Sequence, residues 1–482
     1  MSIHHDLRSY PEYRESGLPW LGPIPAQWDV RRNGRLFAQR NETGFGDLPI
    51  LEVSLKTGVR VRDFDNSKRK QVMSDRDKYK RAVKGDIAYN MMRLWQGAVG
   101  TAPVDGLVSP AYVVARPFAE VDSRYYAYLF RTDAYMNEVN KYSRGIVTDR
   151  NRLYWDEFKQ MPSPFPPTDE QRAIADFLDH HGQAVRRFIR NRRRLIEVLN
   201  EQKQAIIDRA ITRGLDPGVR LKPSGIDWLG GVPEHWEVCG LKQIAAVRLS
   251  GVDKHSIEGE TLVRLCNYTD VYNRDFITAE IDFMAATAKP SEVEAMTLRK
   301  GDVLITKDSE TWDDIAVPAL VAEDLNGVLC GYHLALIRPN ESRITGEYLF
   351  RAFSAPTIGR QFNVAANGVT RYGLSKHAIK TASFVVPPVP EQMAICQWIA
   401  KQLQPLSDAV DRAKREIELI QEYRTRLIAD VVTGKVDVRH LAPDAVEAAS
   451  EEPEPWAEGE DMIDGPDAGD LEPVEEMADA DD

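Results

Sequence analysis

The sequence predicts an α/β (α+β) protein in which two related globular halves alternate with two long helical segments. Three observations support this prediction. A 15-residue segment recurs 208 positions later, shorter motifs follow each copy in the same order, and two stretches carry apolar residues at alternating spacings of three and four. Recurrence in a fixed order is the usual signature of a repeated structural unit. The chain of 482 residues therefore uses one unit of about 210–220 residues twice.

The repeat is clearest at the start of each half. Residues 16–30 (SGLPWLGPIPAQWDV) and 224–238 (SGIDWLGGVPEHWEV) match without a gap at eight of fifteen positions. Two tryptophans in each copy stand in register, and we expect them to pack the entry of each domain. They are Trp20 and Trp28 in the first copy, and Trp228 and Trp236 in the second.

Shorter motifs then return in both halves. They are Lys84-Gly85-Asp86-Ile87 and Lys300-Gly301-Asp302-Val303, Tyr128-Leu129-Phe130-Arg131 and Tyr348-Leu349-Phe350-Arg351, Gly145 with Val147-Thr148 and Gly368-Val369-Thr370, and Pro166-Pro167-x-x-Glu170-Gln171 and Pro387-Pro388-x-x-Glu391-Gln392. This order predicts a pseudo-twofold internal repeat. Its segments are globular domains at 1–165 and 223–386, helical spacers at 166–222 and 387–440, and an acidic disordered tail at 441–482.

Short apolar runs bounded by Gly, Pro and Asn predict strands in each globular half. The runs are 48–55, 86–89, 111–115, 302–306, 334–337 and 383–386, with helical patterns around 123–143 and 345–353. Many short strands with irregular connections predict a twisted, partly antiparallel sheet with a few packed helices. The order of the strands does not follow from the sequence.

The two spacers have the clearest pattern. Thr168-x-x-Gln171 has the spacing of a capping box, and Pro390 can begin the second helix. Gly182 and Pro405 should interrupt the helices, leaving a short docking helix and then a long one of about 30 residues, or roughly 45 Å.

The apolar positions of the spacers predict that the two long helices pair as an antiparallel coiled coil, which would place the globular halves at opposite ends. The alternative is that each stripe is only the core face of a helix. The predicted packing residues are Val185, Phe188, Leu195, Leu199, Ile206, Leu406, Ala409, Ala413, Ile420 and Leu427.

The formal net charge of −12 does not describe the part of the chain that is predicted to fold. Residues 441–482 hold 17 of the 74 Asp and Glu and no Lys or Arg, so residues 1–440 carry +5. A nucleic-acid partner is therefore not excluded. The tail is either a solubilising extension or a mimic of phosphate charge that competes with DNA. Deleting residues 441–482 distinguishes the two, because unchanged DNA affinity at low salt excludes competition.

Other classes of protein are excluded by simple patterns. The sequence has no apolar stretch of about 18 residues, no apolar secretory signal at its N-terminus and no CxxC spacing among its four cysteines. These features predict a cytoplasmic protein without a membrane span, a disulfide framework or a zinc site.

Two non-identical domains on a rod could read two separated points on duplex DNA. A rod of about 45 Å spans roughly a dozen base pairs at ~3.4 Å each. Residues 31–100 hold 16 Lys and Arg against 8 Asp and Glu, and part of this excess could neutralise phosphates. A second basic run at 186–194 could track DNA or hold an acidic partner. The alternative for the first cluster is a solvated loop.

The sequence resembles the specificity subunit of type I restriction–modification systems. The resemblance rests on the paired GxxWLGxxPxxW segments, the PPxxEQ helix starts and the tandem half-repeat, and it covers about residues 10–437. Residues 89–100 (YNMMRLWQGAVG) with 109–112 (SPAY) are similar to one version of that family's target-recognition domain. Residues 305–310 (ITKDSE) with 330–333 (CGYH) resemble another.

The resemblance implies that each target-recognition domain reads one half of a split, asymmetric double-stranded DNA site. It also implies that the paired helices act as a spacer and dock two modification (methyltransferase) subunits, which restriction (translocase) subunits join. S-adenosylmethionine, ATP and Mg²⁺ would belong to those partners, so this chain would bind no cofactor itself. The acidic tail is not part of the family pattern.

The residues agree that the chain is not the catalyst. It contains no NPPY-like or DPPY-like tetrapeptide of an amino-methyltransferase and no GxxxxGK[ST] phosphate loop. Glu157-Phe158-Lys159 has the ExK spacing of a nuclease motif but lacks an upstream Pro-Asp. His180-His181 does not predict a metal site, because adjacent side chains on a helix diverge. We therefore expect no catalytic residue and no metal ligand.

The candidate DNA-binding residues are polar groups in basic clusters and motif loops. Arg reads guanine and Asn or Gln reads adenine in the major groove, although each residue could instead have a structural or phosphate-only role. We expect Trp95 and Trp312 to be core aromatics. The candidates are Arg60, Arg62, Lys68, Arg69, Lys70, Arg93, Gln96, Arg144, Arg150 and Arg152 in the first half, and Lys307, Ser309, Glu310, Arg371 and Tyr372 in the second.

Two other functions remain open on the sequence alone. The chain could be an orphan DNA-binding adaptor or regulator of the same fold, without a modification enzyme. It could also be a free-standing nuclease, which would have to cleave DNA alone with Mg²⁺. An adjacent methyltransferase gene would favour the specificity-subunit interpretation over the adaptor.

Overall fold

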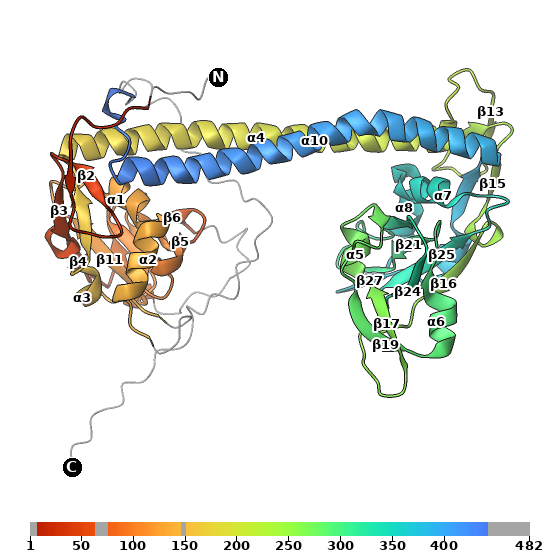
Figure 1. The fold of residues 1–482 in the computed structure, drawn as a ribbon, viewed down its shortest axis with the longest axis horizontal. Helices are drawn as coiled ribbons and strands as arrows, with labels where there is room; N and C mark the ends of the chain where they lie inside the picture. Colours follow the sequence, from red (N-terminus) through yellow and green to blue (C-terminus); the bar gives the residue numbers. More distant parts are fainter. Residues whose placement is uncertain (1–6, 63–75, 146–150, 442–482) are drawn as a thin grey trace, which may run out of the picture. The chain divides into compact units, whose positions relative to one another are not determined.

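The computed structural model describes residues 7–62, 76–145 and 151–441, and the chain divides into two compact units. Unit 1 comprises residues 1–190 and 417–482, and unit 2 comprises residues 191–416. Each unit therefore combines one globular domain with part of each long helix (Figure 1). The segment boundaries predicted from the repeat are a different division of the chain, and they stay a prediction.

Unit 1 is built around an antiparallel four-stranded sheet in the order β4-β11-β8-β9, with α1 and α2 following it in the chain. Its elements are β1 (Tyr13–Glu15), β2 (Pro23–Pro25), β3 (Asp29–Arg32), η1 (Asn33–Arg35), β4 (Phe37–Arg40), β5 (Leu51–Ser54), β6 (Gly58–Val61), η2 (Arg76–Lys78), β7 (Lys80–Ala82), β8 (Ile87–Asn90), η3 (Leu94–Gln96), β9 (Val99–Thr101), β10 (Gly106–Val108), β11 (Tyr112–Pro117), α1 (Ser123–Phe130), α2 (Asp133–Tyr142), α3 (Trp155–Phe158), β12 (Pro162–Phe165) and η6 (Arg439–Leu441).

Unit 2 has a five-stranded sheet in the order β16-β25-β21-β23-β18 and a second sheet in the order β19-β17-β24-β20. Its elements are β13 (Leu221–Pro223), β14 (Gly231–Pro233), β15 (Glu237–Gly240), η5 (Leu241–Gln243), β16 (Ala245–Leu249), β17 (Thr261–Cys266), α5 (Tyr268–Tyr272), β18 (Phe276–Ile277), β19 (Met284–Ala288), α6 (Pro290–Met296), β20 (Thr297–Leu298), β21 (Val303–Thr306), β22 (Asp308–Ser309), β23 (Pro318–Val321), β24 (Leu325–Cys330), β25 (Leu334–Pro339), α7 (Gly346–Ser354), α8 (Pro356–Ala365), β26 (Asn367–Gly368), β27 (Tyr372–Gly373), α9 (Lys376–Thr381) and β28 (Ser383–Val386).

The two main sheets share a frame, as the repeat predicts. The strands β16, β25, β21 and β23 of unit 2 occupy the places of β4, β11, β8 and β9 of unit 1. The predicted strands and helices fall within or beside observed elements in both units. The second sheet of unit 2 also has a counterpart in unit 1, where β5 pairs with β6, β10 pairs with β7, and Ile50 and Leu107 form a parallel bridge. The equivalent strands β17 and β24 of unit 2 pair in parallel, which periodicity alone does not predict.

The repeated Lys-Gly-Asp motif precedes β8 in unit 1 and β21 in unit 2 because its aspartate closes the turn before the strand. Asp86 accepts a hydrogen bond from Val83 N at 2.8 Å and pairs with Arg40 Nε at 2.7 Å. Asp302 is held in the same manner by Arg299 N and by Arg338. Both carboxylates are buried and both have ion-pair partners, so removing one arginine would leave an uncompensated buried charge.

The repeated Glu-Gln pair at each helix start joins the helix to its own globular domain. The amide of Gln171 accepts from Asp122 N at 2.9 Å and donates to Pro166 O at 2.8 Å. Gln392 accepts from Thr345 N at 2.8 Å and donates to Pro387 O at 2.8 Å. The predicted capping box is therefore wrong, because the Gln171 side chain forms its hydrogen bonds with neighbouring loops.

The long helices α4 (Thr168–Arg213) and α10 (Val389–Val432) have 46 and 44 residues and no break. The predicted interruptions are wrong. Pro405 lies inside α10 and removes only one backbone N–H, while Leu403 and Val410 on either side are buried. Gly182 is likewise flanked by the buried His181 and Val185. Packing on both sides keeps each helix continuous, so the two are about 69 and 66 Å long.

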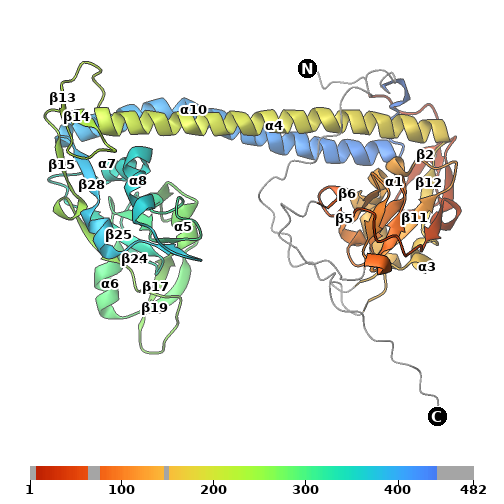
Figure 2. The same cartoon turned by 180° about the vertical axis from the view of Figure 1, so that it is seen from behind.

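The two helices pack against each other in an antiparallel sense within each unit. In unit 1 the His181 and Tyr423 rings lie 5.8 Å apart, and Phe177 and Leu427 share one apolar cluster. In unit 2 Arg192 Nε pairs with Glu416 Oε2 at 2.6 Å. Rising residue numbers in α4 therefore meet falling numbers in α10 (Figure 2).

One residue of the predicted packing stripe lies on the exposed side of the helix. Leu195 is 38% exposed, whereas Ile206 is half-buried and packs against the core of unit 2 beside the buried Ile207. Regular spacing drifts relative to the real contact line, since 3.6 residues per turn do not match a 3.5-residue repeat. Val185, Ala413 and Leu427 are buried, while Phe188, Leu199, Leu406, Ala409 and Ile420 are half-buried.

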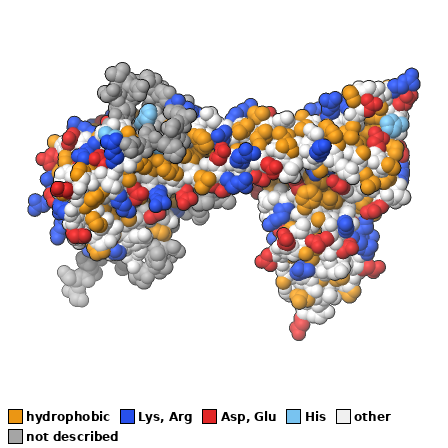
Figure 3. Space-filling view, turned by 45° about the horizontal axis from the view of Figure 1, so that its top comes forward, with side chains coloured by type: hydrophobic (Ala, Val, Ile, Leu, Met, Phe, Trp, Pro, Cys, Tyr) orange, Lys and Arg blue, Asp and Glu red, His pale blue; other side chains and the backbone are white. Residues whose placement is uncertain are grey.

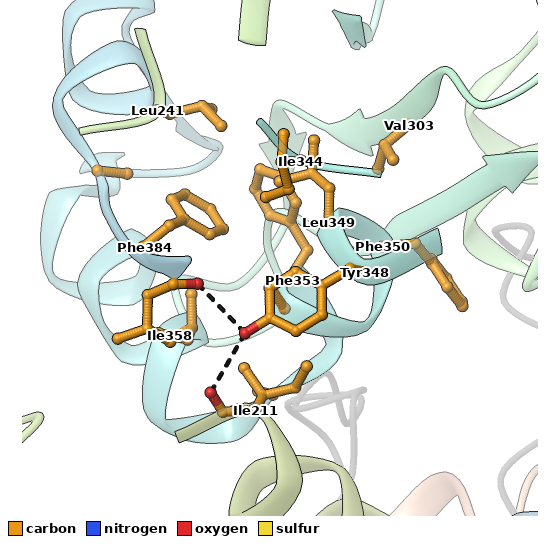
Figure 4. Close-up of a cluster of buried hydrophobic side chains, with 14 of the residues drawn as sticks. Ile211, Leu241, Val303, Ile344, Tyr348, Leu349, Phe350, Phe353, Ile358 and Phe384 are labelled. Atoms are coloured by element: carbon orange, nitrogen blue, oxygen red, sulfur yellow. Dashed lines mark hydrogen bonds between the residues drawn. The ribbon is translucent and has the colours of Figure 1, made fainter. Parts of the chain in front are cut away.

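Each domain core also includes the end of a long helix. In unit 2 the Tyr348 hydroxyl lies 3.5 Å from Ile211 O and 3.2 Å from Val385 O, where α4 meets β28 (Figure 4). In unit 1 the Tyr125 hydroxyl donates to Val432 O at 2.8 Å, at the end of α10. The first domain is therefore completed by residues about 300 positions later in the chain.

The second tryptophan of each copy packs against a glycine at the end of a helix. Trp28 and Trp236 are 1% and 0% exposed, which confirms their predicted packing role. Gly434 follows α10 with φ +78° and lies against Trp28, and Gly214 follows α4 with φ +73° and lies against Trp236. A positive φ without a side chain ends each helix and leaves room for the indole ring.

Candidate nucleic-acid interface

In unit 2 the structure brings together candidate residues that are about 60 positions apart. Strand β22 pairs with β27, so that Asp308 faces Gly373 and Ser309 faces Tyr372. Strand β26 adds a third strand to this small sheet. Lys307, Glu310 and Arg371 therefore belong to one surface, although no pattern in the sequence groups these three residues.

A hydrogen-bond chain supports this surface from below. Lys307 N donates to His333 O at 3.1 Å, and Leu374 N donates to Lys307 O at 2.8 Å. His333 Nδ1 lies 2.9 Å from Asp308 Oδ2 and 3.3 Å from Arg371. One ring nitrogen cannot donate to the carboxylate and accept from the guanidinium at once. Asp308 and Arg371 therefore compete for the same atom of His333.

Aromatic side chains surround these polar groups. Lys307 Nζ lies 4.4 Å from the centroid of the Tyr332 ring, a cation–π distance. The Tyr272 hydroxyl donates to Asp314 Oδ2 at 2.7 Å, and this hydrogen bond raises the pKa of Tyr272 to about 12. Trp312 is 53% exposed, so the expectation that it is a core aromatic is wrong.

The candidates of unit 2 differ in what they can reach. Glu310 and Arg371 are exposed, and Lys307 and Tyr372 are half-buried. Ser309 is 5% exposed, and its hydroxyl accepts a hydrogen bond from Thr311 N at 3.3 Å. Ser309 therefore shapes the loop and does not face a ligand.

In unit 1 a similar convergence joins residues before and after a gap in the described chain. Arg144 and Arg152 form an isolated antiparallel bridge, with N–O distances of 2.9 Å in both directions. Leu153 N donates to Met91 O at 2.8 Å, which places this bridge beside the loop that carries Arg93 and Gln96. Arg144 also pairs with Glu157.

The exposure of the unit 1 candidates is consistent with a surface role. Gln96, Arg144 and Arg152 are exposed and Arg93 is half-buried. Trp95 packs against the core and donates to Met92 O at 3.0 Å, which confirms that it is a core aromatic.

The basic cluster of unit 1 is only partly described. Arg60 on β6 forms an ion pair with Glu52 on β5, and Arg62 N donates to Ile50 O at 2.8 Å. Arg131 holds the turn of this hairpin through the carbonyls of Leu55 and Lys56. Burial lowers the pKa of Arg131 to about 10. Lys68, Arg69, Lys70 and Arg150 lie outside the described residues.

The surface carries both signs of charge. In the face shown in Figure 3, Lys and Arg side chains are interspersed with Asp and Glu in each unit. Among the described residues, no group of three or more His, Cys, Asp or Glu is placed to hold a metal ion. No helix of the described chain combines the length and the hydropathy that crossing a membrane requires.

Comparisons with known proteins agree with these features. The sequence model of the type I restriction modification DNA specificity domain matches residues 28–198. A Methanocaldococcus jannaschii protein assigned as the MjaX type I restriction enzyme specificity subunit is 24% identical over 447 residues, covering 87% of this chain and 96% of its own. The EcoKI specificity subunit of Escherichia coli K12 is 22% identical, covering 69% of this chain and 70% of its own.

A solved structure shares the fold. The solved chain comes from a structural study of complex assembly and conformational transition of the type I R-M system. The two chains superpose with a TM-score of 0.62 at 14% sequence identity. The match covers 85% of this chain and 98% of the solved one. With its internal repeat and its paired long helices, the chain is similar over most of its length to specificity subunits of type I restriction–modification systems, and residues 28–198 match the DNA specificity domain of that family.

Proposed function

We propose that this chain selects the DNA sequence for a type I restriction–modification complex, and that each globular domain reads one half of a bipartite, asymmetric site. One observation carries the proposal. The two domains repeat their buried frame, including Trp28 and Trp236, but the loops that follow β8 and β21 carry different side chains. A shared frame with divergent loops is what two readers of different sequences require, because bases are distinguished by the side chains that reach them.

The exposed candidates supply suitable chemistry for reading bases and binding phosphates. Arg93 and Gln96 in unit 1 offer the guanidinium and amide groups that pair with guanine and adenine. Arg371 and Lys307 in unit 2 offer donors, and Glu310 offers an acceptor for the cytosine amino group. We leave Ser309 out of this set because it is buried.

The paired helices supply the remaining roles in this proposal. They set the spacing between the two half-sites and dock two modification (methyltransferase) subunits, which restriction (translocase) subunits join. S-adenosylmethionine, ATP and Mg²⁺ act in those partners, and this chain contributes recognition without catalysis. Relatives that are named as subunits of type I restriction enzymes support this division of labour.

Exchange of one domain tests the proposal. Residues 16–165 are replaced by the corresponding domain of a relative, and the methylated sequence is read by methylome sequencing of a host that carries the whole system. We expect one half of the bipartite motif to change and the other to stay. The matched exchange of residues 224–386 should change only the other half. A motif that survives both exchanges would contradict the proposal.

A further inference from the structure

The second globular domain carries a net negative charge, but one long stretch at its end contains no acidic residue. Residues 223–386 hold 21 Asp and Glu against 16 Lys and Arg. Residues 348–390 nevertheless contain no Asp or Glu and five Lys and Arg. The cations of this stretch attract phosphates more than the rest of the domain does, and Asp308 and Glu310 are the acidic groups beside it. The stretch includes α8, the hairpin formed by β26 and β27, and α9.

The hairpin of β26 and β27 projects from this stretch. Asn367 pairs with Gly373 and Gly368 with Tyr372, which leaves residues 369–371 at the tip. A Cβ atom at Gly368 would collide with the backbone carbonyl of Arg371, so the turn requires glycine at that position. The tip therefore presents Val369, Thr370 and Arg371 in a tight, defined turn.

The base of the hairpin is fixed to the domain core. Strand β27 pairs with β22, which follows the central strand β21 after one residue. Leu374 is 5% exposed and its N–H donates to Lys307 O at 2.8 Å. A tip on such a support loses little conformational freedom when it binds, which favours precise contacts.

The tip carries the most exposed large apolar side chain of the described residues. Val369 is 92% exposed, while the neighbouring Arg371 and Thr370 are also exposed. The major groove of B-DNA admits a two-stranded β-ribbon, and thymine presents a methyl group there that apolar side chains contact. Val369 projects beside the uncharged Thr370 and the cationic Arg371, so it fits that groove better than it fits a protein core.

We infer that the hairpin of β26 and β27 is the base-reading element of the second domain, and that Val369 recognises the 5-methyl group of a thymine. This inference rests on the proposed function and deepens it by naming the base and the atom that are read. It assigns the recognition to an apolar side chain that was absent from the polar candidates. Arg371 and Thr370 lie beside the contact and can bond to adjacent bases or phosphates.

Removal of methyl groups from either partner tests the inference. The full chain, assembled with its modification subunits, is titrated with a duplex that carries the methylated sequence found in the host. The domain exchange identifies which half belongs to the second domain. Each thymine of that half is then replaced singly by uracil, which removes only the methyl group. The protein variants are Val369→Ala and, as a matched control, Val364→Ala, a second valine that is 86% exposed in the same domain.

At one thymine we expect replacement by uracil to weaken binding about fourfold, because the burial of one methyl group is lost. Val369→Ala should weaken binding to thymine DNA by about the same factor and should add no further loss on uracil DNA. Val364→Ala should bind like the unchanged protein on both duplexes. This pattern identifies a direct contact, because the two changes remove the same interaction.

Three outcomes would overturn the inference. They are a second half-site without any A·T pair, an unchanged affinity of Val369→Ala, and losses that are equal on thymine and uracil DNA, as a partner-protein contact would produce. In each case the domain exchange still reports separately on the proposed function. If that exchange changes one half of the motif, the domains read DNA and only the role of Val369 is wrong.

Discussion

Trp236→Ala is expected to lower the free energy of unfolding of unit 2 by about 3–5 kcal/mol, the usual effect of deleting a buried tryptophan. The indole is 0% exposed and belongs to a cluster that joins the entry segment, the end of α4 and β28. Its ring lies against Gly214, where the helix ends with a positive φ. Alanine would leave a cavity that this backbone cannot close without bending the helix end.

Hydrogen exchange of the β21 and β25 amides in the full chain measures this effect, since unit-specific protection avoids the assumption of a single transition. Trp312→Ala is the matched control. It removes the same side chain from a 53% exposed position and should change the free energy by no more than about 0.5 kcal/mol. Equal effects of the two substitutions would show that burial at the domain entry does not decide stability.

A chain that ends at Arg426 is expected to lose the folded first domain, although every residue of that domain is present. The truncation removes four side chains from the core of unit 1, where they are at most 4% exposed: Leu427, Val431, Val432 and Val438. Each loss costs roughly 2–4 kcal/mol, and four together reach the total stability of a typical domain, about 5–15 kcal/mol. The truncation also removes the carbonyl that accepts from Tyr125.

The control is a chain that ends at Leu441, which keeps the helix end and the segment that pairs with Arg8. Hydrogen exchange of β8 and β11 should be fast in the shorter chain and slow in the control, while β21 and β25 should stay protected in both. Slow exchange of β8 and β11 in the shorter chain would mean that the first domain folds without its distant helix end.

Several parts of the fold could be predicted because the signals are local. The strands 302–306 and 383–386 follow from short apolar runs, and the paired tryptophans follow from their exact register in two copies. The packing of Trp28 and Trp236 could be predicted because both copies keep a large apolar side chain at this position while neighbouring positions differ, and such side chains are usually buried. The same reasoning failed for Trp312, because residue type alone does not say which tryptophan lies on an exposed loop.

The candidate site was predicted as separate loops and became one surface only in three dimensions. Lys307 and Arg371 were chosen for their chemistry, but β22 and β27 bring them together through pairing across about 60 residues. His333 and Asp308 were missed, since their roles depend on a shared ring nitrogen. Val369 was missed because the search favoured polar groups.

The sequence by itself determined the repeated unit, the alternation of globular and helical segments, the family resemblance and most strands, because each depends on residue type and spacing along the chain. Only the tertiary structure decided that α4 and α10 run unbroken, that the first domain is completed by Val431 and Val432, and that the candidate loops of unit 2 converge. These features depend on contacts between residues far apart in sequence. The burial gained on both sides of Pro405 outweighs the local preference to break the helix, and no local pattern records that balance.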